Sequence, residues 1–296
     1  MDHFSTVTGG IVYETGVTGF TNSTGHTAEV QATGWDSDAA AMYTNYITNY
    51  VDKMDTIDKV INHYGSYEAG AANLDLTSVA TVSAGNYLIN SSMSIDNKTI
   101  TFDMSGDNIL VFVDGATITL SNKAYFKITG SNPDAKVLFF LKNGAKIVIN
   151  DNSGIVDLRC FDGDYTNFDY ADLNQGKDHT PRCIIYSLYT ANGAHDNYPV
   201  YFGQNQHRIL TAFLAFYPQS DPNGTGGCHL GMNNPGHDKI LYYGRISAGG
   251  IDVPNGGFLY IPYCPGITGE ANYRDTAYRD ATIFSVIGAE SGYFTA

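Results

Sequence analysis

The sequence has few charged residues, and those of positive sign are the scarcest. Only 16% of its 296 residues are charged, against roughly a quarter in an average soluble domain. Lysine and arginine number 16 against 30 aspartates and glutamates, which gives a net charge of −14 at pH 7. A surface that negative repels phosphate backbones, and no basic stripe interleaved with aromatic residues offsets it. These features argue against a nucleic-acid partner and are compatible with bound cations such as Ca²⁺.

Long apolar runs are also missing. No stretch approaches the roughly 20 apolar residues that cross a bilayer, so we expect no membrane insertion within this chain. Polar residues, not an apolar leader, follow Met1. Either the protein is cytoplasmic, or it is a mature form from which a leader or membrane helix was removed. Low charge with 32 glycines, 22 tyrosines and many threonines, asparagines and serines is typical of extracellular β proteins. We therefore favour an extracellular or cell-surface location.

Cysteine is sparse, and its spacing excludes one kind of site. The four cysteines all lie in the second half of the chain: Cys160, Cys183, Cys228 and Cys264. None forms a Cys-x-x-Cys pair, which argues against a structural zinc bound by thiolates. Two interpretations stay open, namely one or two disulfides in an oxidising compartment, or buried thiols in a core.

What the chain does have is a ladder of short apolar strands between Gly85 and Ile155, with a turn after each. Two segments of the ladder resemble each other, residues 111–120 and 139–149. Each consists of a strand, a turn that ends in Gly-Ala, and a second strand, and the two Gly-Ala pairs lie 29 residues apart. Strands too short to bury their own apolar face, recurring at a fixed offset, indicate a solenoid.

A helical period precedes the ladder. Between residues 36 and 64 the apolar residues recur every three or four positions, which predicts one long helix. Its apolar stripe consists of Met42, Tyr46, Ile47, Tyr50, Met54, Ile57, Ile61 and Tyr64. Asp36 or Ser37 suits its N-cap, and Gly65 suits the position just after its end.

The order of helix and then ladder resembles a known family. The segments 84–89, 99–103 and 108–112, which read AGNYLI, TITFD and NILVF, are similar to strands of the ice-binding-protein-like family of secreted β-solenoids. The resemblance covers roughly residues 35–155. It implies an irregular right-handed β-helix with a long helix packed along one side, in proteins that bind ice or form part of surface adhesins. Residues 160–236 carry aromatics and long loops instead, and look more like β-helical domains of pilus-associated surface proteins.

We therefore predict an all-β fold, an irregular right-handed parallel β-helix with the helix of about 36–64 packed alongside. One domain spans residues 1–296. Residues 1–75 supply N-terminal strands, the helix and a cap, residues 76–263 form the coils, and residues 264–296 form a C-terminal cap.

Two residue patterns could bind a ligand through regular oxygen atoms. The pairs Thr99/Thr101 and Thr117/Thr119 lie 18 residues apart, and strand alternation places both threonines of each pair on one face, as ice binding requires. Threonine is also simply a good outward-facing strand residue. A calcium loop is the second candidate, because carboxylates and an amide at short spacing suit this cation. Its expected ligands are Asp162, Asp164, Asn167, Asp169 and Asp172. A solvated acidic loop is the alternative, since the EF-hand order is absent.

Signals for catalysis are weak. A β-helical polysaccharide lyase needs acidic residues beside a basic one on neighbouring coils. Four arginines are spread among the strands and could lie beside Asp157 or Asp162, but nothing in their spacing selects them: Arg159, Arg182, Arg208 and Arg245. Cys228, His229 and His237 form the tightest histidine group, and their spacing is not that of zinc sites.

Tyrosine is the more informative residue. Nine tyrosines crowd the second half of the chain: Tyr186, Tyr189, Tyr198, Tyr201, Tyr217, Tyr242, Tyr243, Tyr260 and Tyr263. Those that point outward would form an aromatic, hydroxyl-bearing surface suited to glycans or surface proteins, and those that point inward are core. The sequence thus favours a non-enzymatic extracellular or cell-surface protein, adhesin-like or pilus-associated. A β-helical carbohydrate-active enzyme is the alternative, and an ice-binding protein the third.

Overall fold

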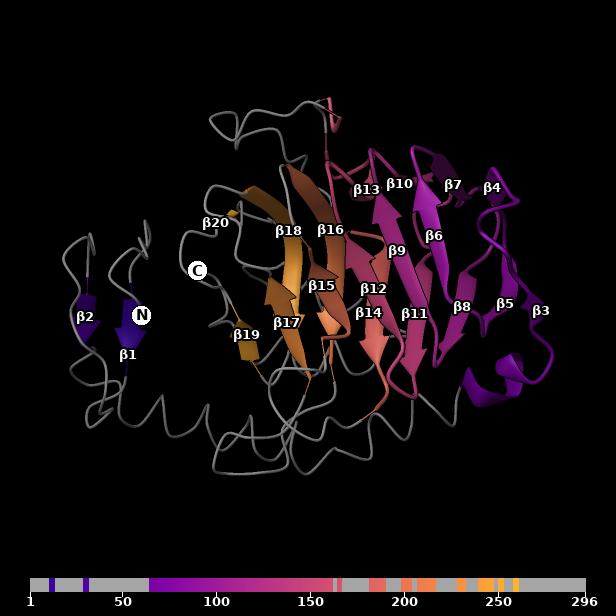
Figure 1. Ribbon diagram of the computed structural model, residues 1–296, viewed down its shortest axis with the longest axis horizontal. Coiled ribbons are helices and arrows are strands. Elements are labelled where there is room, and N and C mark those ends of the chain that lie inside the picture. The colour runs from indigo at the N-terminus through magenta and orange to yellow at the C-terminus, as the bar shows by residue number, and fades with distance from the viewer. Residues whose placement is uncertain are drawn as a thin grey trace.

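A computed structural model describes residues 11–13, 29–31, 64–161, 164–166, 181–189, 198–203, 207–216, 228–232, 239–247, 250–252 and 258–260. Parallel strands dominate these residues (Figure 1). A two-stranded sheet consists of β1 (Ile11–Tyr13) and β2 (Glu29–Gln31). A six-stranded sheet consists of β6 (Met93–Asp96), β9 (Thr117–Ser121), β12 (Lys146–Ile149), β15 (Val200–Phe202), β17 (His229–Met232) and β19 (Gly250–Asp252).

The remaining strands form one curled twelve-stranded sheet. In chain order they are β3 (Ala72–Asn73), β4 (Thr81–Val82), β5 (Gly85–Ile89), β7 (Thr99–Asp103), β8 (Ile109–Asp114), β10 (Tyr125–Thr129), β11 (Val137–Lys142), β13 (Gly154–Asp157), β14 (Cys183–Ser187), β16 (Arg208–Ala215), β18 (Lys239–Ser247) and β20 (Phe258–Tyr260). The expectation of an all-β fold with parallel strands is confirmed.

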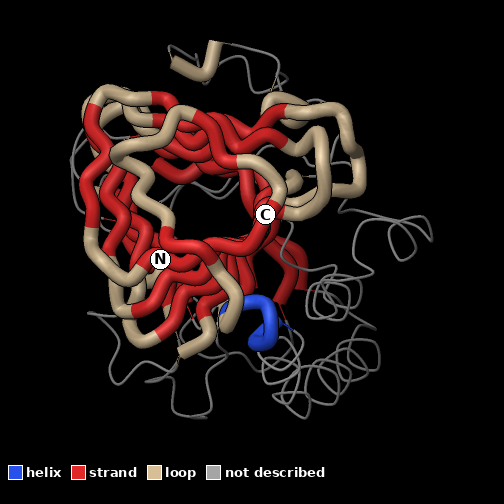
Figure 2. Tube along the Cα trace, turned by 90° about the vertical axis from the view of Figure 1, so that its right-hand side faces the viewer, coloured by secondary structure: helices blue, strands red, loops and turns tan. Residues whose placement is uncertain are grey.

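The chain winds so that successive strands enter three different walls. The first wall contains β4, β7, β10 and β13, the second contains β3, β5, β8, β11 and β14, and the third is the six-stranded sheet. Each strand pairs in parallel with its counterpart one winding later, as β8 does with β11 and β9 with β12. Seen along the stack, the walls surround a closed interior (Figure 2).

The long strand β16 explains why the first two walls form one sheet. Its first part pairs with β13, where Gly154 lies opposite Ile209, and its last part pairs with β14, where Ile184 lies opposite Phe213. The strand therefore passes from one wall to the other without a break, and β18 follows it along its whole length.

The repeat seen in the sequence corresponds to one winding. Thr117, just after the first Gly-Ala pair, lies opposite Lys146, just after the second. Both glycines have a left-handed backbone, with φ of 62° at Gly115 and 77° at Gly144, a conformation that glycine adopts without steric cost. The second turn holds one more residue, Asn143, also at positive φ. Short turns of this kind carry the chain from the second wall to the third.

Apolar side chains from all three walls fill the interior. In β9, Ile118 and Leu120 point inward and are buried, while the alternate threonines face outward, as the period of a strand requires. Three rings meet in the centre, with centroids 5.2 Å apart for Phe102 and Phe126 and 5.7 Å apart for Phe102 and Phe139.

The second wall is buried on its outer side as well. In β8, β11 and β14 the residues that alternate with the core positions are buried: Leu110, Phe112, Leu138, Phe140, Ile184 and Tyr186. Phe140 stacks between Phe112 and Tyr186, with centroid distances of 4.9 and 5.3 Å. The ring of Tyr64 lies 4.9 Å from that of Phe140. A buried apolar layer therefore lies on the outside of β8, β11 and β14.

The prediction of a long helix over 36–64 is not borne out, because residues 36–63 lie outside the described residues. The described helix spans only residues 64–68 and lies against the outside of the stacked strands (Figure 2). Gly65 was expected to follow the end of a helix, and this is wrong, since it lies within residues 64–68. The helix ends at Glu68, whose carbonyl accepts a hydrogen bond from the N–H of Ala71. A glycine inside a helix costs only about 1 kcal/mol relative to alanine, and the neighbouring Tyr64 packs on Phe140.

Candidate binding face

The outer face of the third wall is partly exposed. One row of side chains crosses it, because pairing places Ser94 opposite Thr119, Thr119 opposite Val148, and Val148 opposite Tyr201. All four are half-buried or exposed, which is the ordinary state of the solvent side of a sheet. The wall thus presents hydroxyl, methyl and aromatic groups in register.

Two tyrosines form an aromatic platform at one end of this row. The rings of Tyr198 and Tyr201 stack with centroids 5.3 Å apart and an interplanar angle of 24°. Gly231 lies opposite Tyr201, and a Cβ there would overlap the ring of Tyr198. The ring therefore rests directly on the glycine backbone. Partial burial raises the pKa of Tyr201, while nearby Arg208 acts to lower it, so its hydroxyl stays a neutral donor and acceptor at physiological pH.

The other described tyrosines of the second half are less available. Tyr186, Tyr242 and Tyr243 are buried. Tyr189 donates its hydroxyl to the carbonyl of Ala145 at 3.2 Å, and burial raises its pKa. The side chains of Tyr217, Tyr260 and Tyr263 lie outside the described residues. Of the nine tyrosines, Tyr198 and Tyr201 are therefore the two that form an aromatic surface within the described part.

The two threonine pairs lie on different walls. Thr99 and Thr101 belong to β7 in the first wall, whereas Thr117 and Thr119 belong to β9 in the third. Each pair does share one face, as alternation predicts, but the pairs do not combine into one array. Their neighbours one winding later are Tyr125, Lys127, Lys146 and Val148. A bulky or charged residue thus follows each threonine.

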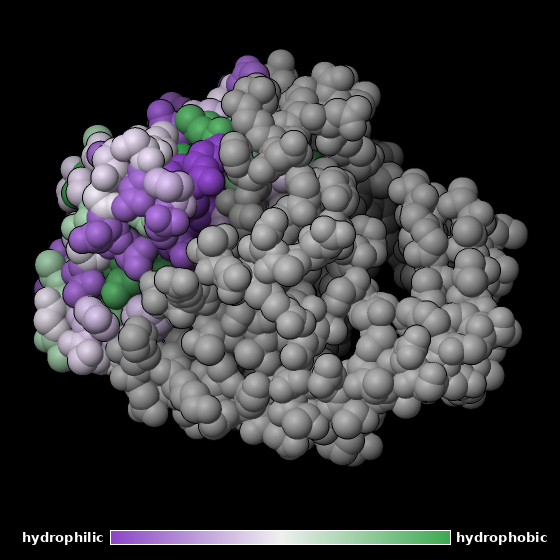
Figure 3. Space-filling view, turned by 180° about the vertical axis from the view of Figure 1, so that it is seen from behind, coloured by the Kyte–Doolittle hydropathy of each residue, from purple (hydrophilic) through white to green (hydrophobic). Residues whose placement is uncertain are grey.

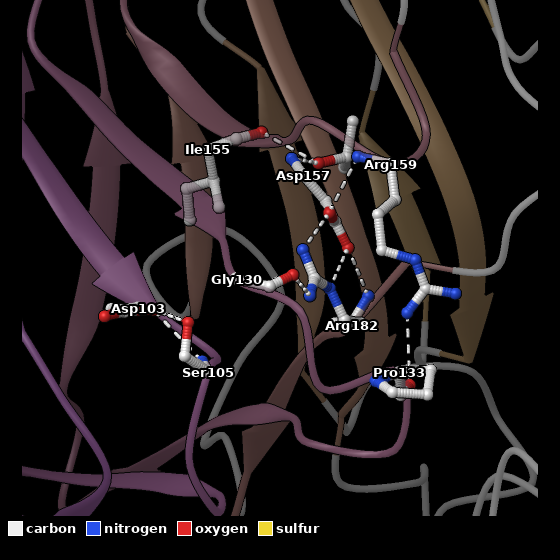
Figure 4. A network of polar contacts seen from close by, with 9 residues as sticks. Asp103, Ser105, Gly130, Pro133, Ile155, Asp157, Arg159 and Arg182 are labelled. Atoms are coloured by element: carbon white, nitrogen blue, oxygen red, sulfur yellow. Dashed lines mark hydrogen bonds and ion pairs between the residues drawn. The ribbon is translucent and has the colours of Figure 1, made fainter.

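Asp157 and Arg182 do come together, in a buried ion pair (Figure 4). Arg182 donates from Nη2 to Oδ1 of Asp157 at 2.9 Å and from Nε to Oδ2 at 3.1 Å. The carboxylate also accepts the backbone N–H groups of Arg159 and Arg182. The remaining guanidinium nitrogen, Nη1, donates to the carbonyl of Gly130.

The ion pair of Asp157 and Arg182 has a structural role, and we call it the clasp. Asp157 is fully buried and the Arg182 side chain is 3% exposed, so neither reaches a substrate. Arg159 points elsewhere and donates to the carbonyl of Pro133, and buried Arg208 donates to the carbonyl of Gly203. The side chain of Arg245 lies outside the described residues. The clasp joins the two ends of the segment between β13 and β14.

The expected calcium loop is described at one position only. Oδ1 of Asp164 accepts hydrogen bonds from the backbone N–H and the hydroxyl of Thr166, at 2.9 and 2.6 Å. Asp162, Asn167, Asp169 and Asp172 lie outside the described residues. Within the described ranges no group of three or more His, Cys, Asp and Glu side chains is placed to hold a metal. Calcium binding here stays a prediction.

Three of the four cysteines are described, and all three are buried and outside any disulfide: Cys160, Cys183 and Cys228. Sγ of Cys228 donates to the carbonyl of Tyr189 at 3.2 Å and accepts from the hydroxyl of Ser187. Burial raises the pKa of Cys228 to about 11. For these residues the buried-thiol interpretation holds. Cys264, His237 and the side chain of His229 lie outside the described residues.

Sequence comparison identifies the family. The profile described as "Domain of unknown function (DUF7305)" matches residues 24–187, more than half of the chain. The chain belongs to this family. The DUF7305 match ends at the last residue of β14, so it includes the clasp and the first half of the third wall. Searches of curated proteins and of solved structures gave no match. In the described part, no helix has the length and apolar character that crossing a membrane requires.

Proposed function

We propose that this protein is a non-enzymatic extracellular or cell-surface module, adhesin-like or pilus-associated, that binds glycans or surface proteins through the outer face of the third wall. The observation that carries the proposal is the platform of Tyr198 and Tyr201 on a sheet face that carries few charged residues. Tyrosine rings offer apolar area together with a polar edge, and they are enriched where proteins bind partners.

The chemistry of the face fits this role. The row that leads to the platform carries hydroxyl groups at Ser94 and Thr119 and a methyl surface at Val148. A rigid sheet holds these groups in fixed register, which lowers the entropy lost on binding. The low charge of the chain and the resemblance to surface adhesins support an extracellular setting.

We also propose the finer architecture, a right-handed parallel β-helix with a helix over 36–64 packed on the second wall. The buried outer layer of that wall, made of residues such as Leu110 and Phe140, supports it. Tyr64, the last apolar residue of the predicted stripe, already packs on Phe140. An amphipathic helix is the element whose apolar face matches such a layer.

The alternatives find less support. Asp157 and Arg182, one of the acid–base combinations that a lyase could use, are buried in the ion pair. The threonine pairs that ice binding would use lie on two walls. Both alternatives are outcomes of the experiment below.

The test uses the full chain on a glycan array and on isolated cell envelopes. Tyr198→Ala with Tyr201→Ala should weaken binding about tenfold or more, a change of roughly 1.4 kcal/mol, and Gly231→Ala should weaken it by displacing the Tyr198 ring. The matched control is Tyr165→Ala, a half-buried tyrosine outside the third wall. New reducing or unsaturated sugar ends would instead indicate an enzyme, and thermal hysteresis in a cooled sample an ice-binding protein.

A further inference from the structure

A hollow, separate from the third wall, lies where the chain passes from the first wall to the second. Its volume is about 590 Å³, within the range of small-molecule clefts. The turns 104–108 and 130–136 form its floor, and the short helix 64–68 forms one side. Its described lining consists of Tyr64, Tyr67, Asn86, Asp107, Asn108, Leu110, Asn132, Asp134 and Ala135. We call this hollow the tyrosine cleft.

One side of the tyrosine cleft is aromatic. Tyr64 is buried against Phe140, and its ring centroid lies 6.1 Å from that of Tyr67. Tyr67 is 44% exposed, and it is the exposed large hydrophobic side chain of the described residues. The surface of the first windings is otherwise mostly hydrophilic, with small apolar patches (Figure 3). An exposed ring beside a hollow is a platform for an apolar ligand surface.

The floor of the cleft is fixed before any ligand arrives. The side-chain nitrogen of Asn132 donates to the carbonyl of Gly106 at 2.7 Å, which ties the two turns together. Oδ1 of Asn108 accepts the backbone N–H of Lys136 at 2.8 Å. The helix is held as well, because Glu68 forms an ion pair with Lys142 of β11 at 2.7 Å. A preorganised site of this kind loses little entropy on binding.

The polar groups that remain available are acceptors and an amide. The carboxylates of Asp107 and Asp134 and the amide of Asn86 make no hydrogen bond within the described structure, and the described lining contains no lysine or arginine. Lys142 is paired with Glu68, and Nζ of Lys136 donates to the backbone carbonyl of Asp134, so two lining carboxylates stand against one nearby ammonium group. The cleft therefore favours ligands rich in hydroxyl donors and repels anions.

We propose that the tyrosine cleft binds a neutral saccharide. The apolar face of a sugar ring stacks on Tyr67, and its hydroxyl groups donate to Asp107 and Asp134 and bond to Asn86. An aromatic platform beside carboxylate and amide acceptors matches the two chemical faces of a sugar. The site lies on other walls than the Tyr198–Tyr201 platform, so it goes beyond the proposed function and stands or falls independently of it.

The experiment titrates the full chain, by ligand-observed NMR and calorimetry, with methyl glycosides of neutral hexoses and N-acetylhexosamines, and with uronic acids as charged counterparts. We expect a neutral glycoside to bind in the millimolar range or tighter and the uronic acids to bind more weakly. Tyr67→Ala should weaken binding about tenfold, Tyr67→Phe should retain most of it, and Asp107→Ala with Asp134→Ala should weaken it further.

Two controls keep the result decisive. Tyr67 is exposed and Asp107 and Asp134 lie on turn surfaces, so these variants should fold, as circular dichroism would verify. The Tyr198→Ala/Tyr201→Ala variant should bind the glycoside in the cleft as the wild type does. The proposal is overturned if no neutral glycoside binds, if uronic acids bind better, or if Tyr67→Ala binds like the wild type. Loss of glycan-array binding in the platform variant alone would bear on the proposed function and leave the cleft intact.

Discussion

At the scale of single residues, Asp157 illustrates how a buried charge is tolerated. Four N–H groups surround its carboxylate, two from the Arg182 side chain and two from the backbone. A buried carboxylate is costly to leave uncompensated, and each of these donors offsets part of that cost. The carboxylate thus holds the start and the end of the segment between β13 and β14 together.

Replacing Asp157 by alanine should therefore lower the free energy of unfolding by about 3–5 kcal/mol, because Arg182 would remain buried without its partner. Chemical denaturation followed by circular dichroism measures this. Asp107→Ala, at an exposed turn, is the matched control and should change stability by only about 0.5 kcal/mol. Similar losses in both variants would show that the ion pair does not act as a clasp.

The buried thiols give a pH-dependent prediction. Burial raises the pKa of Cys228 to about 11, so at pH 8 only about one thiol in a thousand is the reactive thiolate. Alkylation of native Cys228 by iodoacetamide should be slow at pH 8 and should rise about tenfold per pH unit towards pH 11. Cys183, whose pKa burial also raises, should behave likewise.

Peptide mass spectrometry before and after denaturation in urea would measure these rates. Rapid labelling of Cys228 in the native protein at pH 8, or its recovery in a disulfide-linked peptide, would contradict the buried-thiol assignment.

Sequence reasoning reached Asp157 and Arg182 but could not pair them. The two lie 25 residues apart, on either side of a long segment, so their contact depends on how the chain returns to the second wall. No local pattern specifies that. The glycines of the two Gly-Ala turns were predictable, because a left-handed backbone in a short turn favours glycine wherever it occurs.

At the scale of elements, strand pattern and burial agree well. The alternation in β9 predicted which threonines face outward, and they do. The uninterrupted apolar stretches of β8 and β11 contain a further signal, since a strand buried on both faces reads as a continuous apolar run. The sequence therefore carries a signal for a buried outer layer on the second wall, in the apolar runs of β8 and β11.

Adjacent residues of β11 provide a direct test of this layer. Phe139 points into the core and Phe140 points outward, and both are fully buried. We expect Phe139→Ala and Phe140→Ala each to destabilise the protein by about 3–5 kcal/mol. Val148→Ala, on the half-buried outer face of the third wall, should cost about 1 kcal/mol.

Urea unfolding of the three variants under identical conditions gives the comparison. If Phe140→Ala costs no more than Val148→Ala, the outside of the second wall is not covered, and the proposal that a helix over 36–64 packs there loses its main support.

At the scale of the whole molecule, the three walls differ in what lies outside them. The second wall carries a buried apolar layer. The outside of the first wall carries a smaller buried cluster of Tyr125, Val156, Phe161, Ile209 and Leu241, with Tyr165 packed against it. Burial raises the pKa of Tyr125 to about 12. The third wall carries a row of polar, aliphatic and aromatic side chains that are half-buried or exposed.

The repeat in the sequence predicted the winding, but it could not predict which wall has a partly exposed outer face. That depends on where inserted segments fold back, and the one between β13 and β14 places Phe161 and Tyr165 over the first wall. The partly exposed face also depends on register across windings, which brings Tyr201 beside Gly231 and so makes room for Tyr198. Neither contact has a local signature.

The most direct test of the central claim is hydroxyl-radical footprinting of the full chain, with and without a saturating glycan or surface protein selected on the array or from cell envelopes. We predict that bound ligand lowers the oxidation of Tyr198 and Tyr201 on the third wall and leaves that of Tyr165 on the first wall unchanged. The account is contradicted if Tyr198 and Tyr201 are oxidised equally in the free and bound protein, or if the ligand is recovered chemically cleaved.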